Sequence, residues 1–303
     1  MAPTSHPTRP FGALLTAMVT PLTPDGAVDL DAARTLATWL VDQGCDGVVL
    51  NGTTGEAPTT HSPEKADLVA AVVDAIGDRA VVVAGAGSND TAHAARMAAQ
   101  AAEAGADGIL IVSPYYSRPS QEGLVRHMET VADAGGKPVM LYDVPGRAGV
   151  RISADAYARL AEHPLVVATK DATGDVAAAA GLAERTGLAW YSGDDALLLP
   201  FLAHGGAGVV SVAAHAVPAA FAAAIAAWDA GDTAGALAAF RTTLPAIAAL
   251  NGAGFQAVMA KAAVEALGVV SGRTVRLPLV EASDDEAAAV RAGLVAAGVL
   301  ASA

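Results

Sequence analysis

The stretch AVVVAGAGSNDTAHAARMAAQAAEAGADGILIVS, residues 80–113, decides the fold of this chain. It opens with the apolar run AVVVAG and closes with a second apolar run, GILIVS. Between them, Asp90 precedes an Ala-rich segment that stops at Gly105, and these are the start and stop signals of a helix. The order strand, helix, strand predicts two parallel strands joined by a crossover helix.

The same alternation continues in both directions from this stretch. Most of its apolar runs lack polar alternation, which is typical of strands covered on both faces. Eight runs are found: Leu14 to Thr20, Gly47 to Gly52, Ala80 to Gly85, Gly108 to Ser113, Pro138 to Val144, Leu165 to Lys170, Ala189 to Gly193 and Gly208 to Val212. Eight β/α units favour a TIM (β/α)8 barrel over an open sheet. The predicted fold class is therefore α/β.

The remainder of the chain, from about Val217 onward, has helical patterns only. We expect a flexible N-terminal tail over residues 1–10, a barrel over 11–225 and a C-terminal helical region over 226–303.

Composition excludes several classes of protein. The 303 residues are 53% hydrophobic and 16% charged, so the chain should fold. A net charge of −13 argues against a nucleic-acid partner, because binding a phosphate backbone needs a basic face. Cys45 is the only cysteine, which favours a reducing compartment. Since residues 1–10 lack the apolar segment of a signal peptide and the Ala-rich stretch 217–228 is too short to cross a bilayer, we expect a cytoplasmic protein with no membrane partner.

Lys170 is the leading catalytic candidate, because it closes the apolar strand VVATK. In a barrel, catalytic residues come from the carboxyl ends of the strands and the loops that follow. There the Lys170 stem would run up the interior, where desolvation favours the neutral amine. An unperturbed lysine is neutral only about once in 2,500 at pH 7, so a lowered pKa would suit Schiff-base formation with a carbonyl substrate.

The loop NGTTGE after the second strand is a candidate binding site for a small carboxylate. Gly52 and Gly55 free backbone N–H groups, and Thr53 and Thr54 add two hydroxyls. The same loop could be only a turn. Glu56 could complement a helix dipole or act as a capping acceptor.

Tyr142 ends the fifth strand, five residues before Arg147, with a Pro-Gly turn between them. A phenol can shuttle protons and a guanidinium can bind a carboxylate through two hydrogen bonds. The alternatives are a tyrosine at the edge of the core and an arginine in a surface ion pair. Tyr115 and Tyr116 are most simply lid or subunit-interface aromatics.

Other chemistries lack their motifs. The seven histidines show no metal-ligand spacing, and neither a nucleophile elbow nor a P-loop occurs. GAGSND after the third strand lacks the full dinucleotide fingerprint. We expect neither a metal ion nor a cofactor.

Six motifs in order resemble the dihydrodipicolinate synthase family, within the pyruvate-dependent class I aldolases. They are GTTGE, PYYSRP, YDVPGRAG, ATKDATG, YSGDDALLLP and GAGVVSV, and the resemblance runs from about Leu14 to the C-terminus. It implies a TIM barrel with C-terminal helices, usually a homotetramer built from two tight dimers. It also implies condensation of pyruvate with L-aspartate 4-semialdehyde on the route to lysine and diaminopimelate.

The resemblance implies a role for each matching residue. Lys170 forms the Schiff base with pyruvate. Tyr142 is the proton donor and acceptor, and Thr53 and Tyr116 complete a relay to solvent, with the second tyrosine of the pair reaching across the tight-dimer interface.

Three further residues match the substrate pockets of the family. Thr54 and Val210 belong to the pyruvate pocket, and Arg147 holds the carboxylate of the second substrate. The segment Asn251 to Lys261 lacks the proline-rich version found in many members, which we expect to affect packing rather than chemistry.

Two other functions share parts of this pattern. A sister aldolase acting on a sialic or 2-keto-3-deoxy sugar acid would keep Lys170 and Tyr142, but a polyol substrate is better met by neutral groups than by Arg147. A silent binding barrel would have damaged reactive positions, and these are intact.

Overall fold

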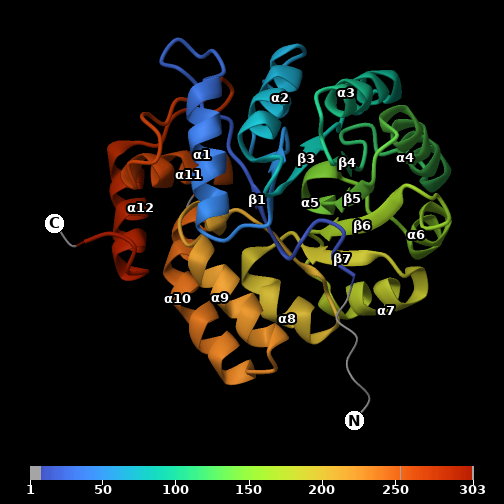
Figure 1. Ribbon diagram of the computed structural model, residues 1–303. Coiled ribbons are helices and arrows are strands. Elements are labelled where there is room, and N and C mark those ends of the chain that lie inside the picture. Colours follow the sequence, from blue (N-terminus) through green and yellow to red (C-terminus); the bar gives the residue numbers. More distant parts are fainter. Residues whose placement is uncertain (1–7, 253, 302–303) are drawn as a thin grey trace.

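The computed structural model describes residues 8–252 and 254–301, and the part described is a closed eight-stranded barrel (Figure 1). All eight predicted runs form strands, and each strand pairs in parallel with its neighbours in chain order. The strands are β1 (Leu14–Ala17), β2 (Gly47–Leu50), β3 (Val81–Gly85), β4 (Gly108–Val112), β5 (Val139–Asp143), β6 (Val166–Asp171), β7 (Ala189–Ser192) and β8 (Gly208–Ser211). The predicted TIM barrel is confirmed.

Helices connect the strands, and most of them cover the outer face of the barrel. They are α1 (Leu30–Asp42), α2 (Glu64–Ile76), α3 (Thr91–Glu103), α4 (Gln121–Gly135), α5 (Pro145–Ala148), α6 (Ala154–Leu160), α7 (Val176–Thr186) and α8 (Leu198–Ala203), with short 3₁₀ turns η1 (Asp195–Leu197) and η2 (Ala213–His215). Asp29 and Asp90 cap α1 and α3 as predicted, each accepting backbone N–H groups of the first turn. Gly105 follows α3 at φ +96°, a conformation that suits glycine.

The C-terminal helices are present, as the sequence predicts. They are α9 (Pro218–Asp229), α10 (Thr233–Asn251), α11 (Gln256–Ala266) and α12 (Asp284–Ala296), orange to red in Figure 1. The expected boundary between residues 225 and 226 falls inside α9. We therefore keep the three-part division of the chain as a proposal.

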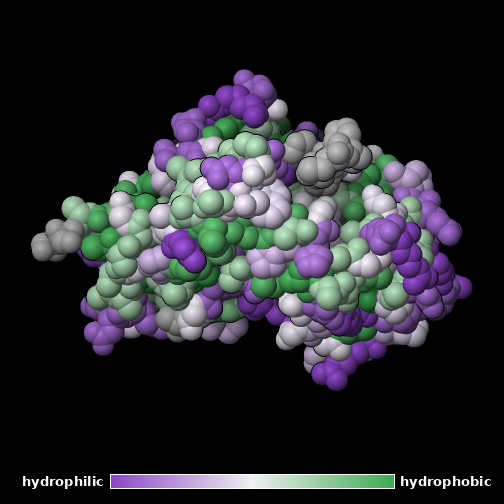
Figure 2. All heavy atoms as spheres, turned by 90° about the horizontal axis from the view of Figure 1, so that it is seen from below, coloured by the Kyte–Doolittle hydropathy of each residue, from purple (hydrophilic) through white to green (hydrophobic). Residues whose placement is uncertain are grey.

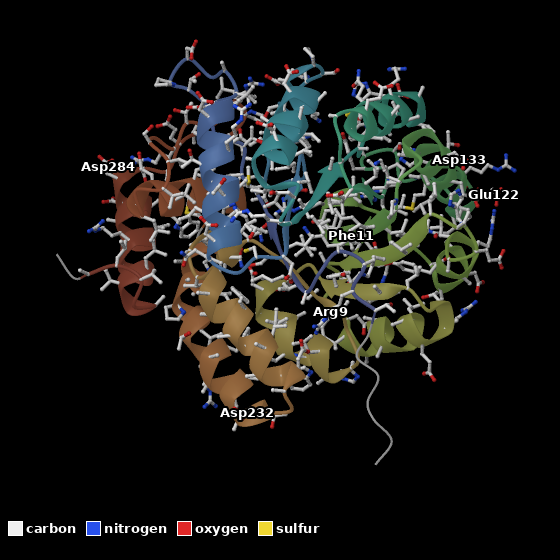
Figure 3. All side chains as sticks on the ribbon, in the orientation of Figure 1. Arg9, Phe11, Glu122, Asp133, Asp232 and Asp284 are labelled. Carbon is white, nitrogen blue, oxygen red and sulfur yellow. The ribbon has the colours of Figure 1, made fainter. Side chains whose placement is uncertain are left out.

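The beginning of the described chain is held against the base of the barrel. Arg9 donates from Nε to the Ala207 carbonyl at 2.8 Å and pairs with Asp229 of α9. Phe11 is 2% exposed, and Figure 3 labels it and Arg9. Of the flexible tail expected over residues 1–10, residues 1–7 lie outside the described part, and Arg9 is fixed by these contacts.

Acidic side chains stand on the outer helices. Glu122 and Asp133 of α4, Asp232 before α10 and Asp284 of α12 point outward in Figure 3. These exposed carboxylates contribute to the net charge of −13.

Helix α10 is the one helix of the described residues long and apolar enough to cross a membrane by length and composition. In this fold it packs on α9, α11 and α12 of the same chain. Pro245 lies inside it, and Leu237 and Leu244 are partly exposed. Seen from below, the molecule mixes apolar and polar residues on its surface (Figure 2).

Candidate active site

Lys170 lies at the carboxyl end of β6, next to Tyr142 of β5 in the sheet register. The two side chains meet, with Nζ of Lys170 4.4 Å from the centre of the Tyr142 ring. Lys170 is 6% exposed. Burial lowers the pKa of Lys170 to about 8, assisted by Arg147 and opposed by Asp195. About one amine in ten is then neutral at pH 7, which supplies a nucleophile for a carbonyl carbon.

Tyr142 is almost buried, and its phenol keeps its proton at neutral pH. Burial raises the pKa of Tyr142, while Arg147 and a hydrogen bond with Thr53 lower it. A protonated phenol with a hydroxyl partner can pass a proton to a bound substrate and recover it. The structure therefore brings three of the predicted site residues together, since Lys170, Tyr142 and Thr53 meet at one end of the barrel.

The loop after β2 is held in shape by buried contacts. Asn51 and Glu56 adopt positive φ angles of 54° and 58°, and the Thr20 hydroxyl donates to the Gly55 carbonyl at 2.8 Å. A Cβ at Gly85 would lie 2.3 Å from the Asn51 carbonyl oxygen, so only glycine fits there. These contacts fix the positions of Thr53 and Thr54 between Asn51 and Glu56.

Glu56 is neither a helix cap nor a dipole partner, because α2 begins only at Glu64. Its carboxylate is buried, pairs with the ammonium of Lys261 from α11 and accepts the Arg276 backbone N–H at 3.0 Å. Both predicted roles for Glu56, as a helix cap and as a partner of the helix dipole, are therefore wrong. Its side chain instead connects the loop after β2 to the C-terminal helical region. Its partner is 205 positions away, so no local pattern could reveal it.

A cavity of about 590 Å³ opens above these residues. Thr53, Tyr116, Tyr142, Arg147 and Phe255 are in its lining. The other three candidates, Lys170, Thr54 and Val210, are buried (0–6% exposed) and are not among the lining residues. This volume lies within the range of small-molecule binding sites.

Arg147 stands at the mouth of the cavity in α5. Its guanidinium carbon lies 5.0 Å from the centre of the Phe255 ring, and Nη2 donates to Oε1 of Gln256 at 3.4 Å. The segment 251–261 thus packs against the cation at the mouth through two of its residues, and its effect on the chemistry stays a prediction. These two residues follow the last strand by more than forty positions, beyond the strand ends where the sequence directed the search.

Tyr116 reaches the rim of the cavity but is 90% exposed in the single chain, with a φ of 70°. A non-glycine residue at positive φ is uncommon, and such residues cluster at functional sites. Tyr115 beside it is partly buried and also lines the cavity.

Metal chemistry has no obvious site within residues 8–252 and 254–301, where no group of three or more His, Cys, Asp or Glu side chains could hold an ion. His215 is fully buried, and its Nε2 accepts the Val19 N–H at 3.0 Å. Burial lowers the pKa of His215 to about 4, so it is a neutral core residue.

The fold and this site define a class of protein. A TIM barrel that holds a lysine of lowered pKa against a protonated tyrosine, under a pocket for small acids, is built for Schiff-base chemistry on carbonyl substrates.

Comparison with known proteins identifies the family within this class. The Dihydrodipicolinate synthetase family matches residues 10–297. The chain is 52% identical over 291 residues to the 4-hydroxy-tetrahydrodipicolinate synthase of Bifidobacterium animalis subsp. lactis, covering 96% of this chain and 95% of that protein. It is 51% identical over 298 residues to the enzyme of the same name from Kineococcus radiotolerans, covering 98% and 97% of the two chains.

Solved structures agree with the family match. The lysine-bound enzyme of Cyanidioschyzon merolae superposes with a TM-score of 0.92 at 37% identity, covering 97% of this chain and 100% of that one. The Bacillus anthracis dihydrodipicolinate synthase DapA-2 gives 0.89 at 39% identity, covering 94% and 98%. This chain belongs to the dihydrodipicolinate synthetase family, and the sugar-acid aldolase is not supported.

Proposed function

We propose that this protein is a lyase that condenses pyruvate with L-aspartate 4-semialdehyde, as a 4-hydroxy-tetrahydrodipicolinate synthase of lysine and diaminopimelate biosynthesis. The family match over residues 10–297 carries the proposal. The contact between Lys170 and Tyr142 supplies the chemistry. The direct test is turnover of the two substrates by the purified protein, compared with cleavage of sialic or 2-keto-3-deoxy sugar acids.

The first step uses Lys170 and Tyr142. The neutral amine of Lys170 attacks the ketone carbon of pyruvate, and the resulting carbinolamine loses water to give an iminium. Tyr142 donates the proton that the departing hydroxyl needs and takes it back from the next intermediate. Thr53, hydrogen-bonded to Tyr142, and Tyr116 at the rim carry the proton to and from solvent.

The second step needs a binding site for each substrate. In this proposal Thr54 and Val210, both buried, form the pyruvate pocket. Loss of a methyl proton turns the iminium into an enamine, whose carbon attacks the aldehyde of the second substrate. Arg147 binds the carboxylate of that substrate through its guanidinium at the mouth. Hydrolysis of the imine then frees Lys170, and the product cyclises.

The protein acts as a cytoplasmic homotetramer, a dimer of dimers, in this proposal. Tyr116 supports the tight dimer, because a phenol that is 90% exposed in one chain has surface to bury against a second copy. Leu277 and Val280, 78% and 70% exposed, offer further apolar area for assembly.

Formation of the pyruvate adduct should depend on pH. Only the neutral amine reacts, and burial lowers the pKa of Lys170 to about 8. The rate of borohydride-trapped labelling with pyruvate is therefore expected to rise with pH and level off above about 8, more than two units below the usual lysine range. A rate still rising tenfold per unit beyond about pH 9 would show that Lys170 keeps an ordinary pKa.

Replacing Arg147 by alanine should separate the two substrates. We expect the Arg147→Ala variant to raise the KM for aspartate semialdehyde by about tenfold or more, since a hydrogen-bonded charge pair is lost. Because Arg147 also lowers the pKa of Lys170, pyruvate labelling is compared on the high-pH plateau, where it should stay within about twofold. Steady-state kinetics and trapping measure the two effects. Arg126→Ala, which removes an exposed arginine of α4, is the matched control. Equal loss of both activities would contradict the role of Arg147.

A further inference from the structure

Asp195 is a buried carboxylate that the mechanism above leaves unused. It lies in η1, directly after β7, and is 2% exposed. Its Oδ2 accepts the backbone N–H groups of Val212 and Ala213 at 3.2 and 2.9 Å and the side-chain amide of Asn251 at 2.7 Å. Its Oδ1 accepts the hydroxyl of Ser211. All four groups donate a hydrogen bond to the Asp195 carboxylate, and none accepts one from it.

A carboxyl group surrounded by donors is held in its ionised form. The Ser211 hydroxyl donates to Oδ1 of Asp195, and its oxygen accepts the Ala214 N–H at 2.8 Å. Burial raises the pKa of Asp195 above its ordinary value, and the four donors oppose this rise. A proton on Oδ2 would face three N–H groups and find no acceptor, so the geometry favours the negative charge.

This charge acts on Lys170. Asp195 raises the pKa of the lysine, against the effects of burial and Arg147. Lys170 carries a positive charge both as the ammonium and as the protonated Schiff base. A carboxylate whose charge favours the ammonium of Lys170 also favours the iminium, in which the pyruvate carbon becomes an electron sink.

Asn251, the last residue of α10, connects Asp195 to the mouth of the cavity. Its Nδ2 donates to Asp195, and its Oδ1 accepts Nε2 of Gln256 at 3.2 Å. Gln256 Oε1 in turn accepts Arg147 Nη2 at 3.4 Å. The carboxylate at one end and the guanidinium at the other fix the orientation of both amides, because reversing either would place donor against donor.

We propose that Asn251 is a positioning residue that ties Asp195, the counter-charge of Lys170, to Arg147 at the mouth. The C-terminal helical region then takes part in both substrate steps. Asn251 acts through its neighbours and touches no substrate. The proposal rests on the proposed function, since it assigns a partner to the Schiff base.

The test uses Asp195→Asn and Asn251→Leu in the full chain. The pH dependence of borohydride-trapped pyruvate labelling and the KM for each substrate are measured. Asp195→Asn removes a charge that raises the pKa of Lys170, so the midpoint of labelling should move by about one unit to lower pH. Asn251→Leu withdraws a donor from Asp195 and frees Gln256. Loss of this donor raises the pKa of Asp195 and reduces its negative charge, so the midpoint should move in the same direction by less. The KM for aspartate semialdehyde should rise about tenfold.

Thr242→Val is the matched control, since this exposed threonine of α10 bonds only to the Ala239 carbonyl among the described residues. Thermal melts establish that each variant folds, and if Asp195→Asn does not fold, Asn251→Leu tests the proposal alone. An Asn251→Leu variant with an unchanged midpoint, or with an unchanged KM, overturns the coupling. A wild-type protein that pyruvate and borohydride do not label would instead overturn the proposed function.

Discussion

The Lys170→Met variant is expected to lose pyruvate-dependent borohydride labelling and to lower turnover by on the order of 10⁴-fold or more, the scale seen when an enzyme loses its covalent nucleophile. Methionine fills a similar volume but cannot attack the ketone. Mass spectrometry of peptides covering residue 170 and an assay of product formation measure the two effects.

The same variant should keep its fold. Burial lowers the pKa of Lys170 from 10.5 to about 8, so the folded state releases the proton more readily than the unfolded chain does. The charged form is therefore disfavoured in the folded protein at neutral pH, and this cost disappears only above pH 10.5. Replacing the amine by an apolar group removes it, and the melting temperature at pH 7 should stay equal or rise.

Lys137→Met is the control, because Lys137 precedes β5 at the amino end of the barrel, away from the site. It should retain labelling and turnover. A Lys170→Met protein that is still labelled by pyruvate would remove Lys170 from the mechanism, whatever its stability.

Breaking the ion pair between Lys261 and Glu56 should have the largest effect on stability. The Lys261→Met variant leaves Glu56 buried and without its counter-charge, which costs about 3–5 kcal/mol of unfolding free energy in such pairs. Urea unfolding followed by circular dichroism measures the loss. Turnover should fall as well, because Glu56 ends the loop that holds Thr53 and Thr54.

Two comparisons separate this effect from a general loss of packing. The double variant Glu56→Gln, Lys261→Met removes the uncompensated charge and should recover part of the lost stability. Arg185→Met breaks an exposed pair with Asp155 and should cost less than about 1 kcal/mol. Equal losses of unfolding free energy for Lys261→Met and Arg185→Met would show that burial does not increase the cost of breaking the Lys261–Glu56 pair.

The sequence predicted the architecture well because each strand and each helix of the barrel is specified by a short, local stretch of sequence. Each strand is a short apolar run, and capping residues such as Asp29 and Asp90 mark where helices begin. It also placed Lys170 and Tyr142 at strand ends, which in a parallel barrel gather at one end. The structure confirms the barrel and shows the two side chains in contact.

By itself, then, the sequence determined the barrel, the family and the strand-end residues, since these depend on periodicity and on motifs a few residues long. Only the tertiary structure decided that Glu56 pairs with Lys261, that Phe255 and Gln256 hold Arg147, and that Asn251 reaches Asp195. The physical reason is distance along the chain. A polar group buried in the fold is satisfied by whichever partner the packing of helices brings near, and nothing in the local sequence of either residue encodes that meeting.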